Sequence, residues 1–292
     1  MFVALQYLLP HHLLCRLVYT LTRSRARWLK NLLIGAFMRG YRPEMADAAE
    51  PEPRNYESFN AFFTRALRPG ARPGPADARA IASPCDGTLS IAGQMNGTSL
   101  LQAKGHQYTL EALLAGQSDW VARLAGGLYA TIYLAPYDYH RIHMPLAGRL
   151  SAAWHVPGRL FSVNQRTAAS VPGLFARNER VVCAFESEQG PFVVILVGAL
   201  FVGSMSTVWH QEVTPSSARR GARALVPVTD SALALLRGAE LGRFNMGSTV
   251  ILLLPPGAAH WDESLIAGAT LRVGQQLGQQ LGQQLGQLDT GA

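Results

Sequence analysis

Between about residues 80 and 255, short apolar runs alternate with turn residues, and this pattern predicts a domain rich in β-strands. Val, Ile, Leu and aromatic residues gather in runs that Gly, Pro and Asn separate. Two stretches, 110–114 and 231–236, have the spacing of helices instead. We therefore expect an α+β fold whose main part is a β-rich, sandwich- or barrel-like domain. The expected strands are 88–92, 128–134, 148–155, 181–185, 192–202, 207–209 and 249–254.

The first 43 residues combine apolar positions with basic ones. Leucine and aromatic residues recur at helical spacing over 13–21 and 28–37, with Arg and Lys between them. This segment has no Asp or Glu, and acidic and basic residues balance over the rest of the chain, so it carries the whole net charge of +7. Pro10, two histidines and Arg16 interrupt the first apolar run, which leaves no stretch long enough to span a bilayer. A basic amphipathic segment of this kind is typical of helices that lie on an anionic membrane surface.

The same segment allows two other interpretations. It could form a helical cap over the core of the protein, or it could be an arm that binds nucleic acid. The scarcity of basic patches further along the chain argues against nucleic acid. A signal peptide fits poorly, because the apolar run precedes the charges and no small-residue cleavage site follows.

Changes in composition divide the chain into three parts. A loop rich in Pro and Gly over 68–78 follows a short helix expected over 56–65. From Gly274 a Gly-Gln-Gln-Leu unit repeats, which predicts a frayed tail to which we assign no function. We therefore expect a helical membrane-associating segment over 1–66, a β-rich domain over 67–273 and a low-complexity tail over 274–292.

The cysteines and histidines give little support to a metal site. Cys15, Cys85 and Cys183 are far apart and include no C-x-x-C pair, so they indicate neither a disulfide framework nor a zinc site, and a reducing compartment is expected. His140 and His143 have a spacing that could ligate a metal. A third ligand at suitable spacing is missing, as is an H-E-x-x-H pattern, so we expect no metal.

Three polar residues near the ends of predicted strands could act together in nucleophilic catalysis. Ser248 opens the last apolar strand, and Gly247 before it leaves its own carbonyl accessible to the serine hydroxyl. Asp86 lies in a turn that leads into a strand, and His143 follows another strand. A carboxylate, a general base and a nucleophile recur together on unrelated folds. The pattern alone leaves structural roles open, and the G-x-S-x-G elbow of many serine hydrolases is absent.

Short motifs along most of the chain carry a more specific signal. They include Phe59-Asn60-Ala61-Phe62-Phe63-Thr64-Arg65, Pro84-Cys85-Asp86-Gly87, Gln102-Ala103-Lys104-Gly105-His106, Asp138-Tyr139-His140-Arg141-Ile142-His143-Met144-Pro145, Gly158-Arg159-Leu160-Phe161-Ser162-Val163-Asn164, Phe175-Ala176-Arg177-Asn178-Glu179-Arg180 and Gly247-Ser248-Thr249. In this order the chain resembles the pyruvoyl-dependent, bacterial-type phosphatidylserine decarboxylase proenzymes, up to about residue 255. The self-processing motif of that family often has Leu where this chain has Met246, which is a conservative change.

The resemblance implies that the chain cuts itself. With Asp86 as the orienting group, His143 would take the Ser248 proton, and the serine oxygen would attack the Gly247 carbonyl. The products would be a β chain of residues 1–247 and an α chain that starts with a pyruvoyl group made from Ser248. The resemblance implies no other cofactor, neither a metal nor pyridoxal phosphate.

The resemblance also implies the reaction that follows. The pyruvoyl ketone would form a Schiff base with phosphatidylserine, accept electrons as CO₂ leaves, and release phosphatidylethanolamine. His140 would transfer a proton in decarboxylation and His143 would be shared between self-cleavage and turnover, because the pKa of histidine lies near the working pH. Which of the two histidines donates the proton stays open. Ser162 and Asn164 would contact the phosphate of the headgroup.

The implied partners are phosphatidylserine and an anionic membrane surface, with no nucleic acid. The cut chains would form a heterodimer that could dimerise further, bound peripherally to the cytoplasmic side of the inner membrane. Three alternatives stay open. A pyruvoyl decarboxylase of soluble amino acids would leave the basic N-terminus without a purpose, and a serine hydrolase using Asp86, His143 and Ser248 would keep its chain intact. A non-catalytic lipoyl-like module, suggested by the turn over 83–88, would need an exposed lysine at a hairpin tip.

Overall fold

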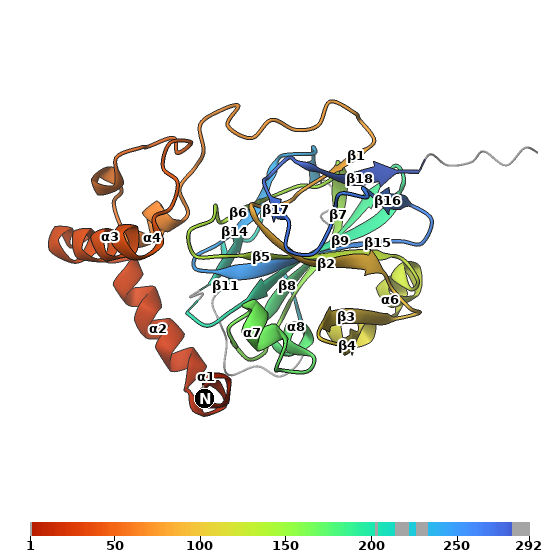
Figure 1. The fold of residues 1–292 in the computed structure, drawn as a ribbon, viewed down its shortest axis with the longest axis horizontal. Coiled ribbons are helices and arrows are strands. Elements are labelled where there is room, and N and C mark those ends of the chain that lie inside the picture. Colours follow the sequence, from red (N-terminus) through yellow and green to blue (C-terminus); the bar gives the residue numbers. More distant parts are fainter. Residues whose placement is uncertain (1, 202–203, 214–221, 226–232, 282–292) are drawn as a thin grey trace, which may run out of the picture.

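Antiparallel β-sheet is the main regular structure of the computed structural model, which describes residues 2–201, 204–213, 222–225 and 233–281 (Figure 1). The largest sheet has the strand order β12-β7-β8-β9-β15-β5-β2-β17, and β13 also pairs with β7. Its strands are β2 (Gly87–Gln94), β5 (Leu128–Leu134), β7 (Gly148–Val156), β8 (Arg180–Ser187), β9 (Gly190–Gly198), β12 (Arg223–Ala224), β13 (Ala234–Leu235), β15 (Ser248–Leu254) and β17 (Thr270–Leu271).

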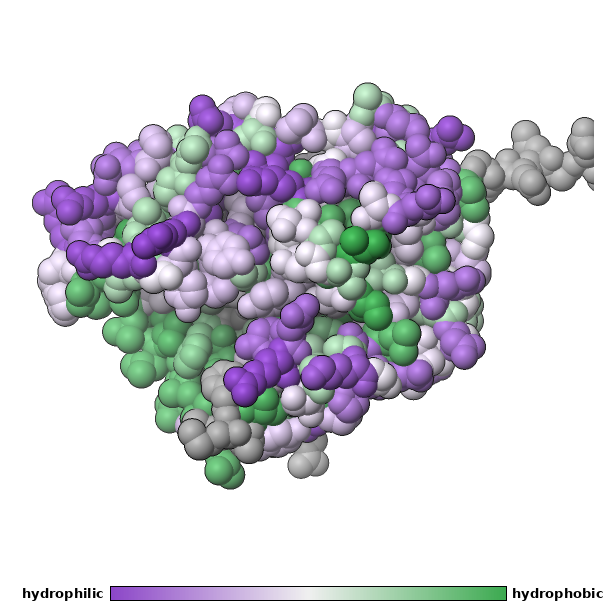
Figure 2. Space-filling model, viewed as in Figure 1, coloured by the Kyte–Doolittle hydropathy of each residue, from purple (hydrophilic) through white to green (hydrophobic). Residues whose placement is uncertain are grey.

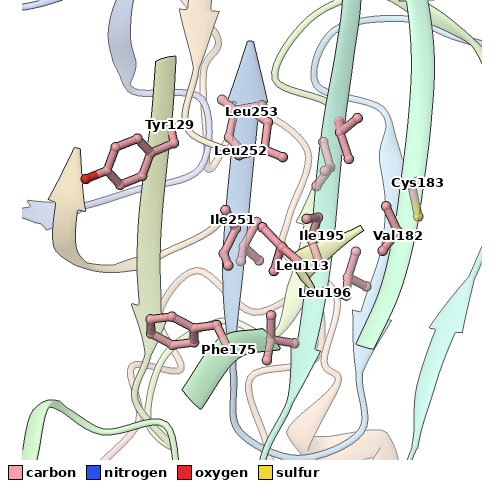
Figure 3. Close-up of a cluster of buried hydrophobic side chains, with 14 of the residues drawn as sticks. Leu113, Tyr129, Phe175, Val182, Cys183, Ile195, Leu196, Ile251, Leu252 and Leu253 are labelled. Carbon is pink, nitrogen blue, oxygen red and sulfur yellow. The ribbon is translucent and has the colours of Figure 1, made fainter. Parts of the chain in front are cut away.

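Strand β15 lies inside this sheet and organises the core. It pairs with β9 on one side and β5 on the other, and every one of its residues is buried. A strand buried on both faces has a continuous apolar sequence, which is why this run was recognisable. Figure 3 shows side chains of Ile251, Leu252 and Leu253 among apolar residues from neighbouring strands and short helices.

Three smaller sheets complete the β-structure. One orders β1 (Ala80–Ala82), β18 (Gln276–Gln280) and β16 (Ala259–Trp261), another orders β11 (Glu212–Val213), β10 (Met205–Thr207), β14 (Glu240–Phe244) and β6 (Arg141–His143), and β3 (Ser99–Ala103) pairs with β4 (His106–Thr109). The short helices among the strands are α5 (Leu110–Leu113), α6 (Ser118–Leu124), α7 (Gln165–Ala168) and α8 (Leu174–Arg177). Because β14 leads directly into β15, the four-stranded sheet places the start of β15 close to β6.

The N-terminal helices lie at one side of the sheets (Figure 1). They are α1 (Phe2–Leu8), α2 (His11–Thr22), α3 (Arg27–Tyr41), the 3₁₀-helix η1 (Pro53–Asn55) and α4 (Phe59–Phe63). Helices α3 and α4 share a small apolar cluster built from Ile34, Phe37, Phe59, Phe62 and Phe63. Within the described residues, no helix has both the length and the apolar character needed to cross a bilayer.

Large apolar side chains of these helices face solvent. Leu13, Leu17, Trp28 and Leu32 are between 58% and 71% exposed. Figure 2 shows apolar surface gathered at the lower left, where Figure 1 places α1 and α2. The helices expected over 13–21 and 28–37 are thus present, with an apolar face that the described part of the chain leaves uncovered.

The β-rich α+β architecture predicted from the sequence is confirmed, with four differences. The large sheet begins at β12 and ends at β17, so the described strands form open sheets and the closed-barrel alternative is wrong for them. The helix expected over 231–236 is wrong at Ala234–Leu235, which pair as a strand with Gly148 and Arg149 of β7; residues 231 and 232 lie outside the described chain. The strand expected over 207–209 is Met205–Thr207. The strand expected over 192–202 ends at Gly198, the residue opposite the first position of β15.

The Gln-rich repeat is not frayed at its start, which corrects the expectation for Gln276–Gln280. These residues form β18 between β1 and β16, and Leu277 enters the main core. A Cβ atom at Gly278 would approach the His260 carbonyl to 2.2 Å, so the glycine of the repeat is required for this pairing. Tertiary pairing therefore overrides the weak strand preference of Gln and Gly. Residues 282–292 lie outside the described chain.

Replacing Leu277 with alanine is expected to lower the free energy of unfolding by about 2–5 kcal/mol, because this fully buried side chain fills the core. Leu281→Ala is the matched control, since Leu281 is 45% exposed and should change stability by no more than about 0.5 kcal/mol. Urea unfolding followed by circular dichroism measures both. Equal, small effects would mean that the repeat does not pack as described.

Candidate functional site

Ser248 stands at the first position of β15, where the central strands of the large sheet end. It lies opposite Leu134 of β5 and Gly198 of β9. Its side chain is 1% exposed, and its hydroxyl has no hydrogen-bond partner within the described residues. A buried hydroxyl is normally hydrogen-bonded, so this oxygen is available for chemistry rather than committed to structure.

The loop 135–140 continues from β5 and brings His140 to the same end of the sheet. The Ala135 carbonyl accepts hydrogen bonds from the Asp138 backbone N–H at 3.0 Å and from His140 Nε2 at 3.1 Å. The Asp138 carboxylate accepts one from the Ala135 N–H at 2.7 Å. These bonds close the loop one residue beyond Leu134, the partner of Ser248.

His140 is fully buried and its ring stacks on Phe63, with 4.1 Å between centroids. Because a carbonyl can only accept, Nε2 carries the proton that bonds to Ala135, and Nδ1 keeps a lone pair. Nδ1 has no partner in the described structure. Burial, and then the charge of Arg65, lowers the His140 pKa to about 3, so the ring is neutral at physiological pH.

Arg65 is a buried cation that sequence reasoning missed. Its side chain is 3% exposed, and Nη2 donates to the Tyr137 carbonyl at 3.3 Å. Nε and Nη1 have no partner within the described residues. Burial lowers the pKa of Arg65, and burial also raises the pKa of the nearby Asp138 carboxyl to about 6. The only signal in the sequence was its place at the end of the aromatic motif that begins at Phe59.

His143 lies on β6 with both ring nitrogens engaged. Nδ1 bonds to the Gly238 carbonyl at 2.8 Å, and Nε2 lies 3.0 Å from the Tyr139 hydroxyl. The carbonyl fixes the proton on Nδ1, so the tyrosine donates to Nε2. Burial lowers the pKa of His143 and raises that of Tyr139 to about 12, which keeps Tyr139 protonated. Tyr139 is a second residue to which sequence reasoning gave no role.

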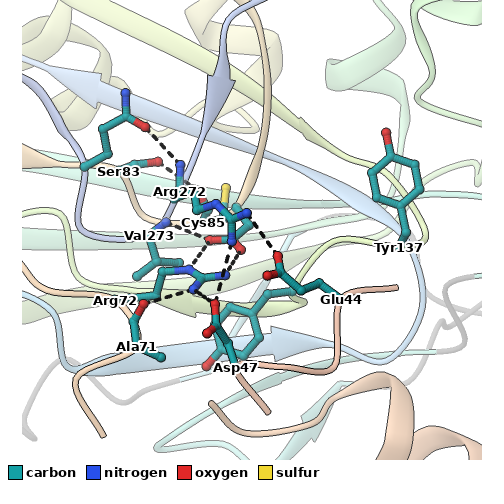
Figure 4. A network of polar contacts seen from close by, with 12 residues as sticks. Glu44, Asp47, Ala71, Arg72, Ser83, Cys85, Tyr137, Arg272 and Val273 are labelled. Carbon is teal, nitrogen blue, oxygen red and sulfur yellow. Dashed lines mark hydrogen bonds and ion pairs between the residues drawn. The ribbon is translucent and has the colours of Figure 1, made fainter. Parts of the chain in front are cut away.

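Asp86 is fixed by contacts outside the expected trio, with Arg72 and Val273, both of which are labelled in the polar network of Figure 4. Arg72 donates to its carboxylate from Nε at 3.2 Å and from Nη2 at 2.7 Å, and the Val273 backbone N–H donates at 2.8 Å. Arg72 also pairs with Asp47 at 2.6 Å. Burial acts to lower the pKa of Arg72, but hydrogen bonds to the two carboxylates raise it above its usual value. Asp86 is thus held by a permanent cation.

The structure brings the expected trio to one region without linking its members directly. The His143 backbone N–H donates to the Pro84 carbonyl at 2.8 Å, which places the Asp86 turn beside β6. In the described part of the chain, however, no hydrogen bond joins Asp86 to His143 or His143 to Ser248. Asp86 bonds instead to Arg72, and His143 bonds to Tyr139, two partners that pattern reasoning could not identify.

A hollow of about 410 Å³ opens beside His143. It is lined by charged and polar side chains that include Arg72, Tyr139, Arg141 and Glu240. Arg141 is engaged there, because it donates to Glu240 at 2.9 Å and to the Thr64 carbonyl at 2.9 Å. The hollow therefore offers a polar approach to the His143 ring.

The loop that contains Ser162 and Asn164 reaches the same strand ends through Asn178. The Asn178 side-chain amide donates to the Phe161 carbonyl at 2.8 Å and to the Gly198 carbonyl at 2.9 Å. Asn164 caps α7, because its side-chain oxygen accepts the Thr167 N–H at 2.9 Å. The Ser162 N–H donates to Gln6 of α1 at 2.7 Å. Both predicted phosphate contacts thus lie in a loop that also has structural contacts.

No group of three or more His, Cys, Asp or Glu side chains within the described residues could hold a metal ion.

Comparison with known proteins gives a consistent result. The family model described as phosphatidylserine decarboxylase matches residues 59–279, and a model described as PSD matches residues 1–42. The phosphatidylserine decarboxylase proenzyme of Ectopseudomonas mendocina is 51% identical over 95% of this chain and 97% of its own length. Those of Methylococcus capsulatus and Saccharophagus degradans are 50% and 46% identical, each over 95% of this chain and 96% of their own length. The chain therefore belongs to the phosphatidylserine decarboxylase family, as its motifs predicted.

Proposed function

We propose that this protein is a proenzyme that cleaves its own chain between Gly247 and Ser248 and then converts phosphatidylserine to phosphatidylethanolamine. Family membership over nearly the whole chain supports the reaction class, a carboxy-lyase. The observation that carries the self-cleavage is the Ser248 hydroxyl, which is buried, has no hydrogen-bond partner among the described residues, and is next to a residue that has no side chain. A serine hydrolase or a carrier module has no comparable support.

The cleavage balances with groups of the chain and one water molecule. Ser248 Oγ loses its proton and attacks the Gly247 carbonyl carbon, and the peptide C–N bond breaks to leave an ester and a free amine at Ser248. Removal of the Ser248 Cα proton then breaks the Cβ–Oγ bond and releases the Gly247 carboxylate. Hydrolysis of the resulting imine releases ammonia and leaves a pyruvoyl group as the new N-terminus of the α chain.

His143 is the proposed base for the first step. The Gly238 carbonyl fixes its tautomer, so Nε2 is the atom with the lone pair. The Tyr139 hydroxyl now donates to that atom, so the tyrosine must either turn away or pass on the serine proton. Burial lowers the His143 pKa. The hydrogen bond to the Gly238 carbonyl is the largest opposing effect, and the charge of Glu240 and then that of Asp86 act in the same direction by favouring the protonated ring. Asp86 thus serves as an electrostatic partner rather than as a hydrogen-bonded orienter.

The surroundings of Ser248 fit a pyruvoyl group, because two buried polar atoms, Ser248 Oγ and His140 Nδ1, have no hydrogen-bond partner in the part of the chain that the structure describes. That group supplies an electron-withdrawing carbonyl that accepts the electron pair left when CO₂ departs. His140, neutral at rest, can take a proton from the incoming amine on Nδ1 and return it to the substrate α-carbon. Its stacking partner Phe63 keeps water from the ring. Neither a metal nor pyridoxal phosphate enters this proposal.

The headgroup phosphate is proposed to meet the loop that contains Ser162 and Asn164. Asn164 uses its side-chain oxygen as a helix cap, which leaves its NH₂ group for a ligand. The Ser162 backbone N–H is already bound to Gln6, so its hydroxyl is the group proposed to contact phosphate. The Asn178 side chain joins Phe161, the residue before Ser162, to Gly198 at the strand ends, which supports this proposal.

Residues 1–66 are proposed to attach the enzyme to the cytoplasmic side of the inner membrane. The exposed apolar side chains of α2 and α3, together with the basic residues of this segment, support contact with an anionic lipid surface. Residues 67–273 are proposed as the catalytic domain. After cleavage, β15 would remain between β9 and β5, so the β and α chains would stay together as a heterodimer.

Self-cleavage is tested on a denaturing gel, with intact-mass analysis of the smaller product. The wild-type chain should give a fragment of residues 248–292 whose mass corresponds to an N-terminal pyruvoyl group, and Ser248→Ala should remain uncut. An uncut wild-type chain in the presence of phosphatidylserine vesicles would reject the proposal. Labelling by a serine-directed phosphonate would then favour the hydrolase alternative.

Variants of the two histidines are expected to impair different steps, self-cleavage for His143 and decarboxylation for His140. His143→Ala should slow cleavage by at least about 10²-fold, because the base is lost. His140→Ala should cleave but then lose decarboxylation by a similar factor. Gel analysis and release of labelled CO₂ from phosphatidylserine measure the two steps, and exchanged phenotypes would reverse the assignment.

Removing the apolar face should weaken membrane binding. Leu13→Gln, Leu17→Gln and Trp28→Gln together are expected to reduce binding to phosphatidylglycerol vesicles at least tenfold, since each buried side chain contributes about 1.5–3 kcal/mol. Ile266→Gln is the control, because Ile266 is 66% exposed but lies outside the N-terminal helices. Vesicle flotation measures the effect. Equal binding by the triple variant would place the membrane contact elsewhere.

A further inference from the structure

Asn245, two residues before Gly247, has all its polar groups occupied. Its backbone N–H donates to the Ser204 carbonyl at 3.0 Å. Its side-chain amide donates to Ser204 Oγ at 2.7 Å, to Ser206 Oγ at 3.2 Å and to Glu212 at 3.1 Å. Its backbone carbonyl and its side-chain oxygen both accept from Asn60 Nδ2, at 3.1 and 3.2 Å. The residue is 4% exposed and therefore firmly held.

Asn60 reaches Asn245 from helix α4, in the N-terminal part of the chain. Ser58 caps this helix by accepting the Ala61 N–H at 3.1 Å. The helix packs in the apolar cluster with α3, and Met246 packs against the same cluster. The two residues before Gly247, Asn245 and Met246, thus both contact the N-terminal helices, the first through hydrogen bonds and the second through apolar packing.

Glu212 connects Asn245 to helix α2. It forms an ion pair with Arg23, the C-cap residue of α2, and accepts a hydrogen bond from the Tyr19 hydroxyl at 2.8 Å. The Arg23 guanidinium also lies over the Tyr19 ring, 3.7 Å from its centroid. A continuous polar chain therefore leads from the helix with the exposed leucines to Asn245.

The peptide to be cut lies between two fixed points. On one side Asn245 is held by these contacts, and on the other Ser248 is paired with both β5 and β9. Space remains around Gly247 between them, since a Cβ atom there would meet, among the described residues other than its two chain neighbours, only the Leu134 carbonyl, at 4.0 Å. Fixing both ends limits the positions in which the carbonyl can meet the serine oxygen, and such orientation contributes strongly to intramolecular reactions.

We propose that Asn60 is a positioning residue for self-cleavage. By holding the carbonyl and side chain of Asn245, it places the Gly247 carbonyl for attack, and cleavage therefore requires the N-terminal helices to be docked on the sheets. This inference rests on the proposed self-cleavage, but it does not involve the later decarboxylation.

The test follows cleavage of the full-length chain during cell-free synthesis, by gel, over time. Asn60→Ala should cleave about tenfold more slowly than wild type. Asn55→Ala is the matched control and should cleave at the wild-type rate, because Asn55 is exposed and its side chain bonds only to Glu50 in the described structure. Once cut, Asn60→Ala molecules should decarboxylate at the wild-type rate per cut molecule, which a general loss of structure would not allow.

A pH profile provides a second readout. In Asn60→Asp the ionised carboxylate cannot donate and faces two oxygens of Asn245, whereas the protonated form can donate one hydrogen bond. The cleavage rate of Asn60→Asp relative to wild type should therefore rise as the pH falls from about 8 to about 5, while the ratio for Asn60→Ala stays flat. Thermal unfolding of each variant, measured by circular dichroism, reports on folding.

The outcomes separate the two proposals. An uncut wild-type chain overturns self-cleavage itself. A cut wild-type chain with Asn60→Ala equally fast overturns only the role of Asn60. If Asn60→Ala loses its cooperative unfolding transition, the test rests on the cleavage rate of Asn60→Asp relative to wild type. A relative rate that does not change with pH overturns the positioning role.

Discussion

The pairing of β15 with two neighbours at once is the constraint on which the site depends. Because β9 and β5 bind both edges of this strand along its length, its backbone has little freedom, and its first residue, Ser248, has a fixed position in a dry environment. The same pairing brings the loop after β5, with His140, to the same end of the sheet. Strand order therefore determines which residues, distant in sequence, surround the serine.

Burial also decides the charges of the site, because a low-dielectric interior disfavours ionised groups that lack partners. His140 is neutral there, and Asp138 holds its proton to a higher pH than an exposed aspartate would. Asp86 has instead the partner Arg72, with which it forms a bidentate contact. Arg65 is the exception, a buried guanidinium with two nitrogens that have no hydrogen-bond partner among the described residues, and its charge further lowers the His140 pKa. The site thus combines a neutral histidine, His140, with an aspartate, Asp86, whose carboxylate is paired with Arg72.

Local pattern predicted those features that depend on local sequence. The apolar run that became β15, the amphipathic helices α2 and α3, and the turn containing Asp86 all follow from periodicity and turn residues. Pattern could not identify the hydrogen bonds of Tyr139 with His143, of Arg72 with Asp86 or of Asn60 with Asn245. Each of these bonds depends on how the folded chain places two side chains in space. The strand β18 was missed for a similar reason, since Gln and Gly have little strand preference and pair there only because β1 and β16 offer both edges. The trio of Asp86, His143 and Ser248 was grouped by residue chemistry and by resemblance, and neither could identify Arg72 and Tyr139 as the side chains that bond to its members.

The contacts of Asn245 also bear on the order of events during maturation. Its partners come from α4, from β10 and from β11, and Asn60 is separated from it by 185 residues of chain. Contacts between residues so distant in sequence form late in folding, because they require the closure of long loops. If cleavage needs these contacts, it cannot precede insertion of β15 into the sheet. A chain cut earlier would release β15 as part of a separate molecule, and its association would then cost the translational and rotational freedom that a continuous chain does not lose. Dependence on long-range contacts thus favours a product whose two chains are already folded together.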